Sequence, residues 1–285
     1  MNAKLLFVHA LSPLHAGTGQ GVGAIDLPIA REKATNLPYL PGSSLKGVLR
    51  DACQDKALRT KIFGPDTTNA ADHAGSVHLT DQRLLLMPIR SLKGTFAWVT
   101  SPFVLQRFVR DVSMASASDA SFPSTVPEVS SPENCLVATQ TALKDADKVV
   151  LEDLQMNAAD GADAWAKAFA PVLFPEDTAW QKLFQERFCI VHDEVFGFLV
   201  ETATEVVARI ALKDDEKTVA KGALWYEESL PAETVLSGLV VAAPVAKTQT
   251  KVPKIFDTVR SLIQKPLQIG GNATVGRGLC QLRMK

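Results

Sequence analysis

The order of strand-like and helix-like segments predicts an α+β fold for this 285-residue chain. A buried strand (4–14) precedes a helix (43–63), in which apolar residues recur every three to four positions. Strands at 75–89 and 94–101 follow, then a helix (101–112) that opens on Ser-Pro, a pair suited to a helix start. A helix (252–263) and a strand (279–284) close the chain. This order predicts a ferredoxin-like β-α-β-β-α-β core that carries insertions.

The middle of the chain supplies the insertion and a hairpin. Residues 113–135 are rich in Ser, Ala and Pro and lack periodicity, which is typical of a loop. A strand (148–156) and two amphipathic helices (163–174 and 177–188) follow. From residue 204, two β-branched runs flank the polar turn KDDEKT, in which Asp214 and Asp215 are ordinary turn residues. We therefore expect one domain over 1–285, with an insertion at about 113–190 and a hairpin at about 204–226.

Composition limits the class of protein. Hydrophobic residues make up 46% of the chain and charged residues 21%, as in ordinary globular proteins. The net charge of −1 argues against a protein that coats nucleic acid through bulk charge, but a local basic groove is compatible with it. No apolar run is long enough to span a membrane. The four cysteines lack metal-binding spacing, which favours reduced thiols in a cytoplasmic protein.

A glycine-rich segment of about 28 residues separates the first strand from the first helix. Loops beyond about 12–15 residues without structure of their own are uncommon and usually functional. The GxGxxA run from Gly19 to Ala24 is not a dinucleotide fingerprint, because no helix follows it. The glycines suit close approach to a partner, and equally a flexible surface loop.

The helix start in LPGSSLKGVLR could hold an anion. Ser43 or Ser44 could cap the helix, and its first N–H groups suit an anion. Lys46 and Arg50 lie four residues apart, opposite the apolar stripe, where they could contact a phosphodiester backbone. A solvated helix face explains the same pattern.

A second glycine-rich segment, QIGGNATVGRG, lies between the last helix and the last strand. Its backbone N–H groups could cradle phosphates, with Arg277 adding charge. Tight helix–sheet packing is the alternative. The glycines of this segment are Gly270, Gly271, Gly276 and Gly278.

Three further residues are weaker candidates for catalysis. His15 and Asp26 share the long loop, so an acid–base pair is conceivable, although a lone histidine is more often structural. Glu227 follows the aromatic pair Trp225-Tyr226, and with Glu228 it is expected to lie exposed at a strand end.

Four stretches of the chain are informative together: SPLHAGTGQGVGAIDLPIARE, LPYLPGSSLKGVLR, GALWYEESLP and QIGGNATVGRG. In this order they resemble the RAMP superfamily of CRISPR proteins, and specifically a repeated backbone subunit of type III-B (Cmr) effector complexes. The resemblance implies an RRM-like palm with a β-hairpin thumb. It also implies copies stacked head to tail along a CRISPR guide RNA, beside the other subunits of the complex.

The resemblance further implies cleavage of complementary target RNA at regular intervals, in a reaction that needs a divalent metal such as Mg²⁺ or Mn²⁺. Asp26 matches the family's catalytic aspartate and would act as a metal ligand or as a general base. Lys46 and Arg50 match residues that hold the guide backbone. A guide-binding filament subunit without catalysis is the alternative. The long loop is expected to be poorly ordered without RNA.

Overall fold

The ferredoxin-like order predicted from the sequence is present, but its third strand is formed by Val235–Ala242 and not by the expected strand over 94–101, which lies beyond the second strand. The computed structural model describes residues 2–19, 21, 24–66, 68, 72–115, 121–212, 215 and 219–285. Four strands form the centre of a mixed sheet in the order β14-β1-β12-β4, and the chain visits them as β1, β4, β12 and β14. Their bounds are β1 Ala3–Ala10, β4 Gln82–Arg90, β12 Val235–Ala242 and β14 Leu279–Met284. The fold is therefore α+β, as expected.

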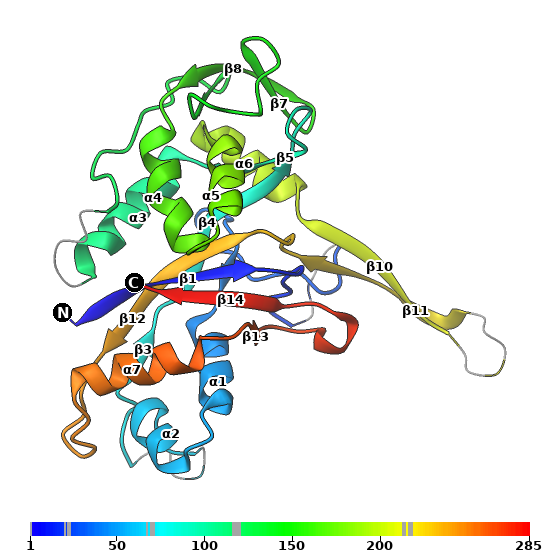
Figure 1. Cartoon of the computed structure of the whole chain (residues 1–285). Helices are drawn as coiled ribbons and strands as arrows, with labels where there is room; N and C mark the ends of the chain where they lie inside the picture. The colour runs from blue at the N-terminus through cyan, green and yellow to red at the C-terminus, as the bar shows by residue number, and fades with distance from the viewer. Residues whose placement is uncertain are drawn as a thin grey trace.

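Helices cover both faces of this sheet (Figure 1). Helices α1, α2 and α7 lie below it in the view of Figure 1, and α3 to α6 lie above it. Strands β1 and β12 are buried over almost their whole length, which explains their continuous apolar sequences. The bounds are α1 Gly42–Ala52, α2 Lys56–Phe63, α3 Pro102–Met114, α4 Asp163–Leu173, α5 Thr178–Glu186, α6 Asp193–Thr202 and α7 Val252–Leu262.

The segment between β4 and α6 extends the sheet beyond β4 in the order β5-β9-β6-β8-β7. A cluster of buried aromatic rings packs beneath it, with Phe108, Phe169 and Trp98 among its members. The remaining strands are β2 Tyr39–Leu40, β3 Val77–Leu79, β5 Phe96–Thr100, β6 Asn134–Val137, β7 Lys148–Leu151, β8 Leu154–Asp160, β9 Phe188–Val191 and β13 Leu267–Gln268.

Three elements expected to be continuous are broken. The helix expected over 43–63 is two helices, because Asp55 accepts the Leu58 N–H and caps a new one. The strand expected over 75–89 breaks at Thr80-Asp81, between β3 and β4. The strand expected over 148–156 is the start of the β7–β8 hairpin, which turns at Glu152 with φ of 48°.

Strands β10 (Glu205–Leu212) and β11 (Val219–Ser229) form a separate two-stranded antiparallel ribbon that projects from the body (Figure 1). Most of the KDDEKT turn, including Asp214, lies outside the described residues, and Asp215 is in a turn. One face of the ribbon is apolar yet exposed: Val206, Ile210, Leu224 and Tyr226 are 42–55% exposed. An exposed apolar face of this kind is typical of a contact surface.

Two findings bear on the environment of the chain. Within the described ranges, no helix combines the length and the apolar character that a membrane crossing requires. The four cysteines are free thiols, and all four are buried.

Candidate functional site

Asp26 lies at the base of the β10–β11 ribbon. Its carboxylate is exposed, and its Oδ2 accepts the backbone N–H of Tyr226 at 2.8 Å. Leu27 continues this pairing: its N–H donates to the Tyr226 carbonyl, and its carbonyl accepts the Glu228 N–H. Leu27 is thus paired with β11, and elsewhere in the loop the Ala30 N–H donates to the Ala16 carbonyl and the Glu32 N–H to the Leu37 carbonyl. Residues 20, 22 and 23 of this loop lie outside the described residues, and poor order without RNA stays a prediction.

His15 is buried, and its ring serves as an internal link. The Nδ1 atom lies 2.6 Å from the Glu228 carbonyl oxygen, so Nδ1 carries the proton that this bond requires. The His15 carbonyl accepts the Gly271 N–H at 2.9 Å. A pairing with Asp26 is not present, because the Asp26 carboxylate contacts β11 instead. The structural interpretation of this histidine is favoured.

Glu227 and Glu228 are 8% and 3% exposed, so the expectation of exposed strand-end glutamates is wrong. Glu227 accepts hydrogen bonds from Trp225 Nε1 (2.8 Å), Asn272 Nδ2 (3.0 Å) and Arg209 Nε (3.2 Å). Three donors occupy its oxygens. Glu227 therefore joins the ribbon to the glycine-rich segment and has little capacity left for chemistry.

The start of α1 differs from the expected serine cap. Neither Ser43 nor Ser44 caps the helix through its side chain; both are exposed in the first turn. Asp81, at the break between β3 and β4, accepts the Gly42 N–H at 2.8 Å instead. An internal carboxylate thus already occupies part of the proposed anion site.

The two cations of α1 have different surroundings. Arg50 donates to the Gly64 carbonyl and to Asp66, so its guanidinium is committed inside the chain. Lys46 is half-buried and has no ion-pair partner among the described residues. Partial burial lowers the pKa of Lys46, and the nearby positive charge of Arg50 lowers it further. Lys46 is therefore the cation that remains available to an outside anion.

The second glycine-rich segment is packed against the long loop. A Cβ at Gly270 would overlap the His15 carbonyl, and one at Gly278 would overlap the Ile269 carbonyl. Several of its N–H groups bond within the chain; the Gly271 N–H donates to the His15 carbonyl and the Gly278 N–H to the Pro13 carbonyl. Arg277 pairs with Glu205 at 2.7 Å. These contacts favour the packing interpretation over a phosphate cradle.

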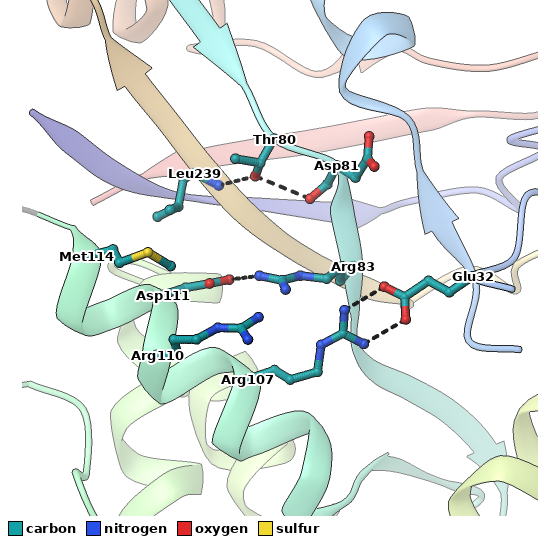
Figure 2. Close-up of a pocket in the computed structure, with 9 residues that line it drawn as sticks. All are labelled: Glu32, Thr80, Asp81, Arg83, Arg107, Arg110, Asp111, Met114 and Leu239. Atoms are coloured by element: carbon teal, nitrogen blue, oxygen red, sulfur yellow. Dashed lines mark hydrogen bonds and ion pairs between the residues drawn. The ribbon is translucent and has the colours of Figure 1, made fainter. Parts of the chain in front are cut away.

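A pocket of about 590 Å³, which sequence reasoning missed, is lined by residues of α3, β4 and the long loop. Figure 2 shows these residues. Arg107 forms two hydrogen bonds with Glu32, at 2.5 and 2.7 Å, and Arg83 pairs with the buried Asp111. The hydrogen bond from Arg107 lowers the pKa of Glu32 despite partial burial. The polar run REK at residues 31–33 was the sequence signal for this contact. The Arg107–Glu32 pair anchors the long loop to α3.

A ferredoxin-like sheet with a projecting ribbon and a long loop fixed at its base defines a protein of the RRM-like class. The family model described as the RAMP superfamily matches residues 7–281. The chain therefore belongs to the RAMP superfamily.

Relatives at full length support this assignment. The chain is 37% identical to the CRISPR system Cmr endoribonuclease Cmr4 of Pyrococcus furiosus, covering 100% of this chain and 96% of that protein. The crystal structure of oligomeric Cmr4 from Pyrococcus furiosus aligns with a TM-score of 0.76 and 29% identity, covering 100% and 98%. A chain of the type III-B Cmr-beta complex bound to cognate target RNA shares the fold, with a TM-score of 0.75 at 19% identity, covering 100% and 97%.

Proposed function

We propose that this chain is the guide-RNA-binding backbone subunit of a type III-B CRISPR effector complex and that it cleaves complementary target RNA. Its full-length relative from Pyrococcus furiosus is a Cmr endoribonuclease, and a solved structure of that relative is oligomeric. One observation carries the catalytic assignment: Asp26 is an exposed carboxylate held by a backbone hydrogen bond at the base of a projecting ribbon. Its partners are guide RNA, target RNA, further copies of itself head to tail, and the other subunits.

Asp26 has one oxygen committed and one available. Oδ2 accepts the Tyr226 N–H, and no other hydrogen bond to this carboxylate is present within the part of the chain that the structure describes. The free Asp26 oxygen can accept the proton of an RNA 2′-hydroxyl while the 2′-oxygen attacks the adjacent phosphorus. The bond from phosphorus to the 5′-oxygen then breaks, and that oxygen takes a proton from water, which leaves a 2′,3′-cyclic phosphate and a 5′-hydroxyl. Alignment of the hydroxyl with the scissile bond supplies much of the rate.

A divalent metal, Mg²⁺ or Mn²⁺, fits Asp26 only together with RNA. The described residues contain no group of three His, Cys, Asp or Glu side chains that could hold an ion. Magnesium is commonly bound through one or two carboxylates plus substrate phosphates, and the free Asp26 oxygen suits one such contact. A bound metal would offset the charge that develops on the phosphate.

We further propose that the whole chain, residues 1–285, is one RAMP domain, with an insertion at about 113–190 and a thumb at about 204–226. The exposed apolar side chains of the β10–β11 ribbon support the thumb assignment, because apolar side chains can separate stacked bases. The four free thiols support a reducing cytoplasmic location.

The experiment that tests the function is reconstitution. Purified chain is mixed with a repeat-tagged guide, the other subunits, Mg²⁺ and a complementary RNA labelled at one end. We expect a ladder of fragments at a fixed spacing, and no cleavage of a non-complementary RNA. Filaments that bind the target but leave it intact would instead support a subunit without catalysis.

Replacing Lys46 with alanine is expected to weaken guide binding, because this cation has no ion-pair partner among the described residues. Loss of one phosphate contact reduces the slope of log affinity against log salt by about 1. Because the pKa of Lys46 is lowered, this side chain loses its charge at a lower pH than an ordinary lysine does. As the pH rises, we therefore expect its contribution to binding to be lost earlier. Affinity is measured by filter binding over a series of salt concentrations.

Arg50→Ala is the matched control for Lys46. The Arg50 guanidinium is bound to Gly64 and Asp66, so we expect the Arg50 variant to have a lower melting temperature. We also expect its salt slope to change less than that of the Lys46 variant. A larger loss of salt slope in the Arg50 variant than in the Lys46 variant would contradict these assignments.

A further inference from the structure

The carboxylate of Glu228 joins three separate segments. Its Oε1 accepts hydrogen bonds from Arg31 Nη2 at 2.6 Å and from Thr204 Oγ1 at 2.9 Å. Its Oε2 accepts the Ile29 N–H at 3.1 Å. Ile29 and Arg31 belong to the long loop, whereas Thr204 directly precedes the ribbon. One buried side chain thus ties the loop to both strands of the ribbon base.

The backbone of the same residue extends this connection to Asp26. The Glu228 N–H donates to the Leu27 carbonyl at 3.0 Å, and the Glu228 carbonyl accepts from His15. Two residues earlier on β11, the Tyr226 N–H donates to Asp26. Asp26 therefore moves with the ribbon base as long as these contacts hold.

The ion pair of Glu228 with Arg31 is shielded from water. The Glu228 side chain is 4% exposed and that of Arg31 is 17% exposed. Arg31 also donates to the carbonyls of Asn36 and Val200, the latter near the end of α6. Removing one partner of a buried pair leaves an uncompensated charge, so the loop would not keep this position without Glu228.

We infer that Glu228 is a positioning residue for cleavage. It holds Asp26 in register with the β10–β11 ribbon, so that the RNA is cut beside the ribbon. The inference rests on the proposed function, because it assumes that Asp26 acts on RNA. Glu228 does not touch RNA in this account; it acts through the loop.

A second anchor of the same loop serves as a matched control. Glu32 is held by Arg107 of α3 in a two-hydrogen-bond pair, which faces the pocket of Figure 2. The Glu32–Arg107 pair resembles the Glu228–Arg31 pair in chemistry but forms no hydrogen bond or ion pair with the ribbon among the described residues. If any loss of a loop anchor impairs cleavage, substitutions at Glu228 and at Glu32 should both do so. If the position of Asp26 against the ribbon is what matters, only the substitution at Glu228 should impair cleavage.

The test compares Glu228→Gln and Glu32→Gln in the assembled complex by single-turnover cleavage. For E228Q we expect a cleavage rate about ten- to a hundredfold lower, because misplacement by about 1 Å can cost that much. We also expect cuts at neighbouring phosphodiesters and unchanged target affinity. E32Q should cut at the wild-type rate and positions. If E228Q fails to assemble, Thr204→Val, which removes a single donor, should give the same spread of cuts to a smaller degree.

The outcomes separate this inference from the proposed function. Loss of cleavage in an Asp26 variant, combined with wild-type rate and cut positions in E228Q, would overturn the inference alone. Equal losses in E228Q and E32Q would also overturn it, since the effect would then be general. Full cleavage without Asp26 would overturn the proposed function itself.

Discussion

Replacing Asp26 with alanine is expected to abolish target cleavage in the assembled complex while target binding persists. The side chain supplies the only proposed proton acceptor or metal contact at the site. Loss of a group with that role costs about 10²–10⁴ in rate. Cleavage is measured as a single-turnover rate constant on end-labelled RNA, and binding is measured by filter retention of the same RNA.

Asp26→Asn separates chemistry from loop position. The asparagine side-chain oxygen can still accept the Tyr226 N–H, so the loop keeps its contact with β11. It has no charge, and it neither takes up a proton nor attracts a cation as a carboxylate does. We expect both variants to lose cleavage. Wild-type cleavage by the asparagine variant would show that the carboxylate is needed only as a hydrogen-bond acceptor.

Replacing Gly278 with alanine is expected to destabilise the fold, because this glycine is required by packing. Its φ is +78°, where an L-residue is strained, and a Cβ would overlap the backbone oxygen of Ile269. Strain and overpacking together should cost on the order of 3 kcal/mol. The free energy of unfolding is measured by urea denaturation of the isolated chain.

Gly276→Ala is the control for backbone strain without overlap. Its φ is +81°, yet an added Cβ would meet no heavy atom within 4 Å among the described residues. We expect a loss of about 1 kcal/mol, the cost of a left-handed conformation alone. If both variants are as stable as the wild-type chain but bind RNA more weakly, the glycine-rich segment contacts phosphate after all.

Local patterns predicted whole elements where their signals lie within the element. The helix α3 begins where Ser101 and Pro102 predict, and the Ser101 hydroxyl accepts the Val104 N–H. Helix α7 also matches, because its periodicity is local. The break before α2 had its own signal in Asp55, a good capping residue. The break at Asp81 had none, because that residue caps a helix 39 positions away.

The candidate site depended less on local pattern than the fold did. The sequence indicated a functional loop, and the family resemblance assigned Asp26, but neither could place that residue against the ribbon. The importance of Glu228 also escaped pattern reasoning, since a glutamate at a strand end is usually exposed.

By itself, the sequence determined the α+β class, the order of its core elements, and the loop and helix that carry the candidate residues. Only the tertiary structure decided which charged groups are available. Arg50 bonds to Asp66, 16 positions away, Arg277 to Glu205, 72 away, and Arg31 to Glu228, 197 away. Residue spacing reports neighbours along a helix or strand, whereas ion pairs form between segments that folding brings together. Lys46 and Asp26 thus stand out as candidates, because folding leaves a charge on each that no ion pair within the described residues neutralises.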